Sequence, residues 1–403
     1  MKITFQTPEL QKRLGQLGAV IARTSQEALY VSVRIFSNAA GIMFLQGADG
    51  DSTLTLKLPN ATTDDKSANM LVEYARLNAI VQRFTAPQAV LALNGESEAV
   101  LLSGRSRARL SCLPTAPFMS LPVVSTIPTE EEIAVSGGVV LPLPGLKGQI
   151  EQVLFTVPKE QSKYVMASAL IFAKDKILTV AGCDSKMIGM SLAPIDSEFP
   201  SFTIPKTALE LLSKLDGGAL NLVTVIDSES MLTFSTDCEL LTYGQTHAEF
   251  PPYQRVIPEA GSHVLCITLK NKETFLAALE TIRPSCLGLF KGVAFSVKSA
   301  TELCLTAARV DKQATGVVFT DMADESLDAD ITGTAVKFEL DIDRLLPFAK
   351  QATFPVTLYV KSSSTPVDIH ANGGTPDKPV YRLVVMPMNI ESGVSSTPIS
   401  VVE

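Results

Sequence analysis

The sequence lacks the segments that would place it in a membrane or direct it out of the cell. No apolar run reaches the length of a membrane span. The segment 1–23 carries Glu9, Lys12 and Arg13 where a signal peptide would need an apolar core. We therefore expect a cytoplasmic protein.

Cysteine and histidine are too few and too scattered for the common metal and redox sites. The six cysteines include no CxxC pair, which argues against a zinc site or a disulfide framework. Three histidines are present, and none has the spacing of a metal ligand or of a base that activates a nucleophile. We expect buried free thiols, no metal and no cofactor.

Motifs for nucleotide binding and catalysis are also missing. The chain has no GxxxxGK[ST] loop and no GxGxxG turn. The run Asp49-Gly50-Asp51 resembles the start of a calcium loop, but Asn60 stands where a bidentate glutamate is required, so a tight turn is the better interpretation. Asp184 with Lys186 is the one nearby pair of acid and base. The sequence favours a binding protein over an enzyme.

Length and composition indicate a globular protein of more than one domain. At 403 residues the chain is too long for one hydrophobic core, so two or three domains are expected. A hydrophobic content of 46% with 19% charged residues is typical of folded proteins. The net charge of −8 by itself argues against nucleic-acid binding.

Internal repetition is the main structural signal. Helical spacing of apolar residues occurs in six windows: 8–23, 73–84, 144–157, 205–215, 270–283 and 340–350. The second window of each pair begins at 73, 205 and 340, at intervals of 132 and 135 residues. Alternating segments at 90–102, 220–243 and 356–369 read as hairpins.

This pattern predicts an α+β unit repeated three times, with two helices on one face of a mostly antiparallel sheet. The last helix contains Pro347, so a late start or a kink is expected there. The six windows hold 13 Lys and Arg against 8 Asp and Glu, which gives them +5 and leaves −13 elsewhere. The helices could share a positive surface for a phosphate backbone. Ordinary solvated helix faces remain the alternative.

Two stretches predict a rigid junction near the second and third repeats. The run 249–258, EFPPYQRVIP, has too many prolines for a helix and too many apolar residues for a free linker. If VVMPM at 384–388 lies beside it, Met386 and Met388 supply adaptable apolar walls for varied peptides. An ordinary domain junction with a buried last strand is the alternative.

Five stretches together resemble the bacterial DNA polymerase III beta subunit, the replication sliding clamp. They are MKITFQTPELQKRL at 1–14, SGRSRARLSCLP at 103–114, IPKTALELLSKLDGG at 204–218, FPPYQRVIP at 250–258 and YRLVVMPMNI at 381–390. They fall in all three repeats and in the order of that family. Singly each is weak, and collectively they are specific.

The resemblance implies three domains of the DNA-clamp type at 1–124, 125–255 and 256–390, followed by a flexible C-terminal tail at 391–403. Two subunits would join head to tail into a ring homodimer, with the helices lining the ring interior and the antiparallel sheets outside. Such a ring encircles double-stranded DNA without sequence preference and tethers the replicative DNA polymerase. It is not an enzyme.

The resemblance also implies a groove for short peptide motifs of the replicative polymerase, the clamp loader and repair proteins. By position, this partner-peptide groove comprises Met166, Cys183, Ser185, Lys186, Met187, Ile188, Pro251, Arg255, Val256, Val384, Val385, Met386, Pro387 and Met388. The family usually has a more basic run where this chain has Cys183 to Ile188, so a different peptide preference is expected.

Two further surfaces follow from the resemblance. Positions for duplex DNA contact are Arg23, Arg76, Arg83, Tyr164 and Lys206, and helix faces add Lys147, Lys270 and Lys272. Positions for the ring contact between subunits are Arg105, Arg107, Leu110 and Ile282. Ala108 replaces a bulky residue there, and the run 309–313 is a poor acidic partner. The alternative is thus a diverged second clamp that serves a phage, plasmid or repair polymerase and closes its ring weakly.

Overall fold

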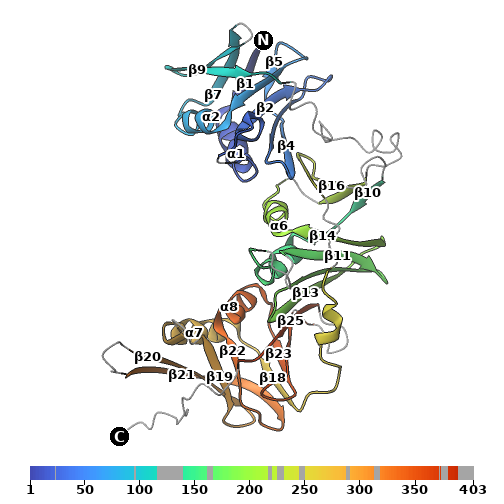
Figure 1. The fold of residues 1–403 in the computed structure, drawn as a ribbon, viewed down its shortest axis with the longest axis vertical. Helices are drawn as coiled ribbons and strands as arrows, with labels where there is room; N and C mark the ends of the chain where they lie inside the picture. Colours follow the sequence, from blue (N-terminus) through green and yellow to red (C-terminus); the bar gives the residue numbers. More distant parts are fainter. Residues whose placement is uncertain are drawn as a thin grey trace. The chain divides into compact units, whose positions relative to one another are not determined.

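The structure is a computed structural model that describes residues 1–22, 24–94, 97–115, 139–160, 167–216, 220–224, 231–244, 250–286, 291–312, 318–371, 373 and 380–388. Two compact units make up the chain. Unit 1 comprises Met1–Lys147 and Thr207–His247, and unit 2 comprises Gly148–Lys206 and Ala248–Glu403. Figure 1 gives the position of each element along the chain.

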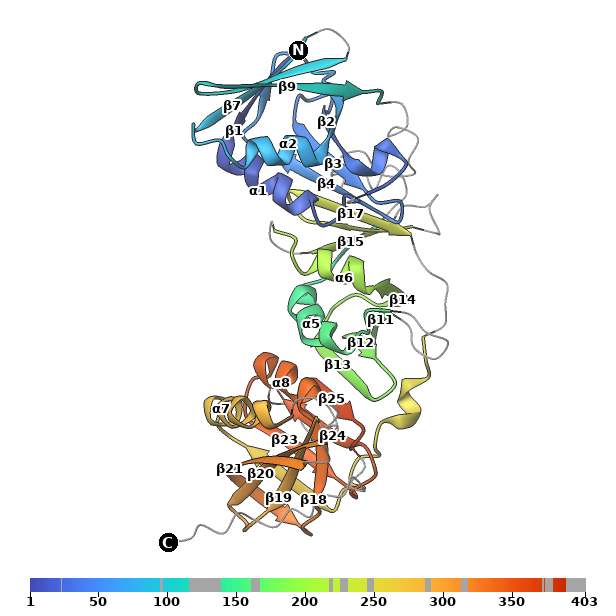
Figure 2. The ribbon, with the colours of Figure 1, turned by 60° about the vertical axis from the view of Figure 1, so that its left-hand side comes forward.

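Unit 1 contains a thirteen-stranded antiparallel sheet in the order β10-β15-β16-β17-β4-β3-β2-β6-β9-β8-β7-β1-β5. Its strands are β1 Lys2–Gln6, β2 Ser32–Ser37, β3 Met43–Ala48, β4 Ser52–Leu58, β5 Thr62–Thr63, β6 Asn69–Glu73, β7 Gln88–Asn94, β8 Glu98–Ser103, β9 Ser106–Leu113, β10 Val139–Pro142, β15 Asn221–Thr224, β16 Met231–Ser235 and β17 Glu239–Gly244. Helices α1 (Thr7–Leu17) and α2 (Tyr74–Val81) pack side by side, as Figure 2 shows, and α1 contacts β3 and β4. The short η1 (Ala28–Val31) precedes β2.

Unit 2 contains a twelve-stranded antiparallel sheet in the order β14-β11-β12-β13-β25-β24-β23-β18-β21-β20-β19-β22. Its strands are β11 Ser168–Lys174, β12 Ile177–Cys183, β13 Met187–Pro194, β14 Phe199–Pro205, β18 Leu265–Leu269, β19 Gly292–Val297, β20 Glu302–Lys312, β21 Val318–Gly333, β22 Phe338–Asp341, β23 Val356–Val360, β24 Val367–Ala371 and β25 Tyr381–Val385. Its helices are α7 Lys272–Ile282 and α8 Ile342–Gln351, with short η2 Leu154–Thr156, η3 Tyr253–Val256 and η4 Arg283–Cys286. The boundary between the units falls inside α5 (Leu146–Val153) and directly after the first residue of α6 (Lys206–Leu212).

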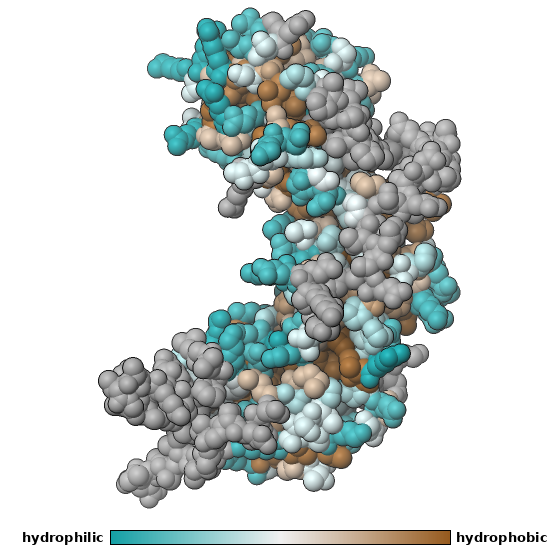
Figure 3. Space-filling view, viewed as in Figure 1, coloured by the Kyte–Doolittle hydropathy of each residue, from teal (hydrophilic) through white to brown (hydrophobic). Residues whose placement is uncertain are grey.

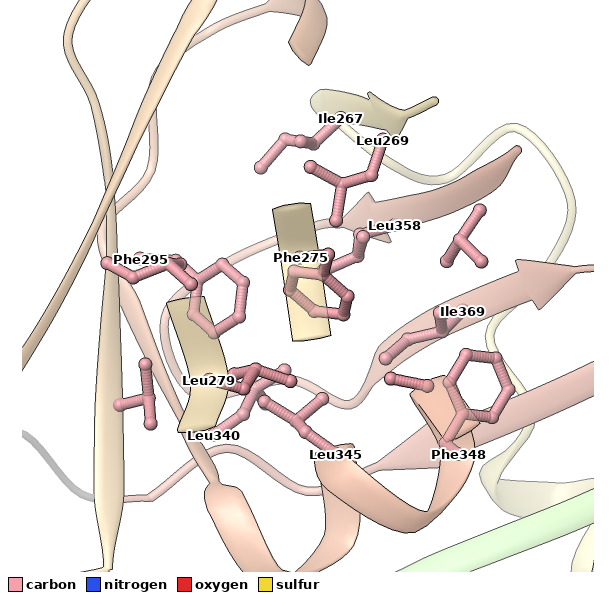
Figure 4. Close-up of a cluster of buried hydrophobic side chains, with 14 of the residues drawn as sticks. Ile267, Leu269, Phe275, Leu279, Phe295, Leu340, Leu345, Phe348, Leu358 and Ile369 are labelled. Carbon is pink, nitrogen blue, oxygen red and sulfur yellow. The ribbon is translucent and has the colours of Figure 1, made fainter. Parts of the chain in front are cut away.

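The core of unit 2 shows why these residues form these elements. On α7, Phe275, Leu279 and Ile282 recur at helical spacing and are buried against the sheet. Figure 4 shows Phe275 near Leu358 of β23 and Leu279 near Leu345 of α8. Each fully buried side chain of this size contributes about 2 kcal/mol to folding. The apolar stripes thus hold both helices on one face of the sheet.

Capping side chains define where these helices begin. The Asn271 side chain accepts a hydrogen bond from the Thr274 amide (3.0 Å) at the start of α7. The Asp341 carboxylate accepts one from the Asp343 amide (2.9 Å) at the start of α8. Such caps stabilise a helix by about 1 kcal/mol. Pro347 lies inside α8, which begins two residues later than the predicted window.

All six predicted helices are present, and each is shorter than its predicted window. The described strands of the three predicted hairpins are present as β7–β8, β15–β16–β17 and β23–β24. The predicted α+β class is confirmed. The division into three domains stays a prediction, because the strands of predicted domain two are shared between the sheets. β17 pairs with β4 in unit 1, and β13 pairs with β25 in unit 2.

Two turns reveal the repeat at the level of single atoms. The Asp49 carboxylate accepts from the amides of Asp51 (3.0 Å) and Ser52 (2.7 Å), which confirms the predicted tight turn between β3 and β4. The Asp184 carboxylate accepts in the same way from the second and third residues after it, both at 2.7 Å, between β12 and β13. Each turn precedes the strand that joins the next repeat.

The turns also bind the partner strand alike. The Asp51 carbonyl accepts from the Gly244 amide (2.9 Å), and the Lys186 carbonyl accepts from the Met386 amide (2.8 Å). We call the pairing of β4 with β17 the first junction and the pairing of β13 with β25 the second junction. Counting from Asp51 and Lys186 relates β4 to β13, and counting from Gly244 and Met386 relates β17 to β25.

No helix in the described ranges is long and apolar enough to span a membrane.

Candidate functional site

A pocket of about 280 Å³ lies on unit 2 at the second junction. Its walls are Cys183, Asp184, Ser185, Lys186, Met187, Ile188, Pro251, Pro252, Tyr253, Val256, Pro366, Val384 and Met386. Figure 3 shows apolar side chains gathered beside the position of η3. The volume suits a few apolar side chains rather than a large ligand.

The pocket exists because a proline-rich segment crosses the outer face of the sheet. Ile188 of β13 lies opposite Val384 of β25, and both side chains belong to a small buried cluster that also contains Tyr253. The Tyr253 ring meets Phe250 edge to face at 5.9 Å between ring centroids. The prolines limit helical structure here to the short 3-10 helix η3, which the sequence did not predict.

The rim of the pocket exposes large apolar side chains. Val256 is 49% exposed and Met386 is 42% exposed. Exposed apolar groups around a pocket mark a surface that gains free energy when a partner covers it. The flexible Met386 side chain can adapt to different partner side chains.

The thiol in the pocket wall has no nucleophilic role at neutral pH. Burial, and to a lesser extent the neighbouring Asp184 carboxylate, raise the pKa of Cys183 to about 11. A neutral thiol behaves as a small apolar side chain. Cys183 therefore extends the apolar wall.

The structure brings nine of the predicted groove residues together as pocket walls. They are Cys183, Ser185, Lys186, Met187, Ile188, Pro251, Val256, Val384 and Met386. Arg255 is exposed on η3 beside the pocket, outside its walls. Met166 and Tyr164 lie outside the described residues.

Three described residues that were predicted for the groove are not pocket walls. Val385 is fully buried in the core beneath α7 and α8, because side chains alternate along β25. Pro387 and Met388 are not among the pocket walls, and the Met388 amide donates to the Glu339 carbonyl of β22 (2.9 Å). Four walls were not among the predicted groove residues: Asp184, Pro252, Tyr253 and Pro366. Pro366 has no local signal, because the β23–β24 hairpin brings it from far along the chain.

The arginines predicted for DNA contact are exposed where they are described. Arg76 lies on α2 and Arg83 follows its end. Neither has an ion pair among the described residues. Arg23 lies outside the described residues.

The predicted lysines have structural partners. Lys272 donates to the carbonyls of Lys350 (2.7 Å) and Ala352 (3.1 Å) at the end of α8. Lys206 donates to the Val157 carbonyl, and Lys147 to the Leu215 carbonyl. An ammonium group at the carboxyl end of a helix is favourable because it meets the negative end of the helix dipole.

Lys270 is engaged by a side chain instead, in an exposed ion pair with Asp330 at 2.6 Å. Exposed pairs of this kind contribute little to stability. Its ammonium group therefore remains accessible to a phosphate at small cost.

The residues predicted for the ring contact divide into two groups. Arg105 is exposed in the turn before β9, and Arg107 is exposed on β9. Leu110 is 1% exposed and Ile282 is fully buried, so each packs inside its own unit and neither side chain reaches the surface. The sequence analysis missed an acidic stripe on β21, where Asp324 and Asp328 are exposed. The run 321–330, DMADESLDAD, was the available signal.

Both units have long strand edges that are unpaired among the described strands, and two of them are on β9 and β21. Residues 106–111 of β9 pair with β8 alone, because β6 reaches only Cys112 and Leu113. Residues 318–328 of β21 pair with β20 alone, because the pairing of β21 with β18 begins only at Ala329. Unpaired edges of this length are ready to accept another strand.

No group of three or more potential ligand side chains in the described part of the chain could hold a metal ion.

Comparison with known proteins identifies the fold. No protein-family model matches the chain. The C. crescentus beta sliding clamp has a TM-score of 0.81 at 18% identity, covering 97% of this chain and 99% of that one. The Helicobacter pylori beta clamp bound to a DNA ligase peptide has a TM-score of 0.78 at 15% identity, covering 97% of this chain and all of that one. The chain has the DNA-clamp fold.

Proteins related in sequence indicate which type of DNA clamp the chain resembles. The beta sliding clamp of Salmonella typhimurium is 24% identical over 400 residues, which cover 97% of this chain and all of the relative. The predicted resemblance to the bacterial DNA polymerase III beta subunit, the replication sliding clamp, is therefore confirmed in sequence and in fold.

Proposed function

We propose that the chain is a DNA sliding clamp that encircles duplex DNA as a head-to-tail ring homodimer and tethers the replicative polymerase. The observation that carries this proposal is the pocket at the second junction of a DNA-clamp fold, whose exposed rim residues Val256 and Met386 suit apolar side chains of a partner. The clamp would not be an enzyme and would act in the cytoplasm.

The ring follows from the repeat. Two of three equivalent junctions form within the chain, and the strands of the third, β9 and β21, have free edges among the described strands. Arg107 on β9 and Arg105 in the turn before it are exposed, and β21 carries exposed Asp324 and Asp328. Pairing of β9 with β21 of a second copy would complete the series with opposite charges facing each other.

Light scattering tests this ring. A mass of two subunits that persists on dilution supports it, and Arg105→Glu with Arg107→Glu should then give monomers. A wild-type protein that is monomeric at every concentration would contradict ring closure without a loader. The comparisons give no support to a diverged second clamp.

Duplex DNA would be held by exposed cations such as Arg76 and Arg83, with few contacts and no base readout. The experiment is retention on circular duplex after loading by the clamp loader of the same cell. An encircling clamp stays on the closed circle at high salt and leaves once the circle is cut. Equal retention on both forms would contradict encirclement.

The pocket would take the peptide motifs of the polymerase, the clamp loader and repair proteins. The DNA ligase peptide bound to the Helicobacter pylori clamp supports this kind of partner. Fluorescence anisotropy with a labelled apolar peptide measures the affinity. Loss of binding on Met386→Asp, with no change in retention on circular DNA, would separate the two functions.

A further inference from the structure

An ion pair joins the rim of the pocket to the start of α8. The Nη1 atom of Arg344 lies 2.6 Å from the Oδ2 atom of Asp184, although 160 residues separate them in the sequence. The side chains are only 17% and 19% exposed. Such a shielded, charge-assisted bond is stronger than an exposed ion pair.

The Asp184 carboxylate lies at the centre of a hydrogen-bonded chain. Its Oδ1 atom accepts from the amides of Lys186 and Met187, and its Oδ2 atom accepts from Arg344. The Nε atom of Arg344 lies 3.3 Å from Asp341, which caps α8. The rim turn is thus fixed to a rigid helix rather than to another loop.

The rim turn in turn positions a pocket wall. The Lys186 carbonyl accepts from the amide of Met386, the exposed apolar wall. A shift of the turn would therefore move both the Lys186 side and the Met386 side of the pocket.

The first junction shows that the turn does not need this cation in order to form. Asp49 makes the same pair of amide hydrogen bonds, and no described residue forms an ion pair with it. The cation is found at the junction that has the pocket. Its contribution is therefore to the pocket and not to the turn alone.

We propose that Arg344 is a positioning residue of the pocket, an inference that rests on the proposed peptide-binding function. It holds the Asp184 turn in place and neutralises the one carboxylate in the pocket wall. Lys186 then remains the one charge in the wall without an ion pair among the described residues. The preferred occupant is a peptide with apolar side chains and an acidic residue beside them.

The test measures the affinity of the full chain for two labelled peptides that carry Leu and Phe side chains and differ in one flanking residue, Asp or Asn. The wild type should bind the Asp peptide more tightly. Arg344→Gln should weaken the Asp peptide about tenfold and the Asn peptide less, because the uncompensated Asp184 carboxylate repels the acid. Arg344→Lys should restore most of the affinity.

Two controls exclude a general loss of structure. Asp49→Asn changes the turn carboxylate of the first junction, the counterpart of Asp184, and should leave peptide affinity unchanged. Thermal unfolding of Arg344→Gln should stay within a few degrees of the wild type, while amide exchange at Lys186 and Met386 becomes faster and that at Asp51 and Gly244 does not.

The outcomes separate this inference from the proposed function. If the wild type binds neither peptide, the peptide-binding function fails and the inference with it. If the wild type binds both peptides and Arg344→Gln binds each with the affinity of the wild type, the peptide-binding function is supported. The positioning role of Arg344 is then overturned. Failure of Arg344→Lys to restore affinity would also overturn it.

Discussion

The two junctions share a backbone plan and differ in the side chains on their outer faces. Where the second junction has Ile188, Met190 and Val384, the first has Thr53, Thr55 and Thr242 at matching positions. Two of these threonines bond to polar neighbours, Thr242 to Thr233 at 3.1 Å and Thr55 to Gln46 at 2.9 Å. A face whose hydroxyls are already satisfied offers a peptide's apolar side chains little.

The difference explains why one junction has a binding pocket in an otherwise repeated fold. An apolar outer face gains free energy when it is covered, whereas a face of paired hydroxyls gains almost none. The same strands and turns can therefore serve as a plain joint or as a docking site. Side chains at a few alternating positions decide which.

The inner faces differ as well. In the first junction Glu239 is fully buried and lies 2.5 Å from Arg13 of α1. At the matching position of the second junction, the Tyr381 hydroxyl donates to the Gln152 carbonyl of α5 (2.7 Å). The inner face of the first junction is thus stabilised by an ion pair, and that of the second junction by a neutral hydrogen bond.

The largest loss of stability should come from removing the ion pair between Arg13 and Glu239. Glu239→Ala leaves the Arg13 guanidinium, 5% exposed, without its buried partner, and the free energy of unfolding should fall by about 3 kcal/mol. Amide exchange in β4 and β17, measured by mass spectrometry, should become faster. Tyr381→Phe is the matched control at the second junction and should cost about 1 kcal/mol. Equal losses in both variants would contradict the distinction.

The second prediction uses pH to separate the two outer faces. Asp368 of β24, at the position matching Thr233, pairs with Arg382 at 2.6 Å and with His370 at 3.0 Å. Burial alone would raise the pKa of Asp368, but its hydrogen bonds to His370 and Arg382 outweigh burial and hold the pKa below the ordinary 3.8.

The sign follows from proton linkage. Because the folded pKa is lower than the unfolded one, this carboxylate stabilises the fold above about pH 4 and loses that contribution as the pH falls further. Asp368→Asn should be about 2 kcal/mol less stable at pH 7 and should flatten the acid limb of unit 2 in a pH series of urea unfolding. Thr233→Val should leave the pH dependence unchanged. An unaltered acid limb in Asp368→Asn would contradict this account.

A third prediction converts one junction toward the other. Val384→Thr introduces the residue found at the matching position of the first junction, Thr242. Peptide affinity should fall about tenfold because a hydroxyl replaces an apolar contact in the pocket wall. The measurement is fluorescence anisotropy with the Leu- and Phe-containing peptide. Thr242→Val at the first junction is the control, and a gain of peptide binding there would show that one position suffices.

The smallest effect concerns the helices behind each junction. Lys272 bonds to the end of α8, whereas in unit 1 Gln11 bonds to the Val81 (2.9 Å) and Phe84 (3.0 Å) carbonyls after α2. Lys272→Met and Gln11→Leu should each cost about 1 kcal/mol in urea unfolding. Salt should shrink only the Lys272 effect, because only that bond carries charge. A drop in DNA retention with Lys272→Met would instead indicate a direct DNA contact.

The sequence predicted what depends on local pattern. Apolar spacing was sufficient for all six helices, and Asp49-Gly50-Asp51 for its turn, because these are set by residues a few positions apart. The two stretches FPPYQRVIP and VVMPM contain six of the thirteen pocket walls. The walls Cys183 and Ser185 to Ile188 were indicated by the family resemblance.

What the sequence could not show depends on long-range packing. Nothing near Arg344 signals that it meets Asp184, and nothing near Lys272 signals that a helix end satisfies its charge. Leu110 and Ile282 carry the apolar character of an interface residue and of a core residue alike, and only the packing distinguishes these roles. Alternation along β25 likewise separates Val384 from Val385.

The strands of the middle repeat belong to two sheets, so cutting the chain at a repeat boundary would expose unpaired strand edges. A fragment ending at residue 124 would keep β4 and lose β17, and so expose five backbone pairing positions along a flat edge. A fragment starting at residue 256 would lose β13 and expose β25 in the same way. Fragments cut at the repeat boundaries should therefore aggregate more readily than the full chain.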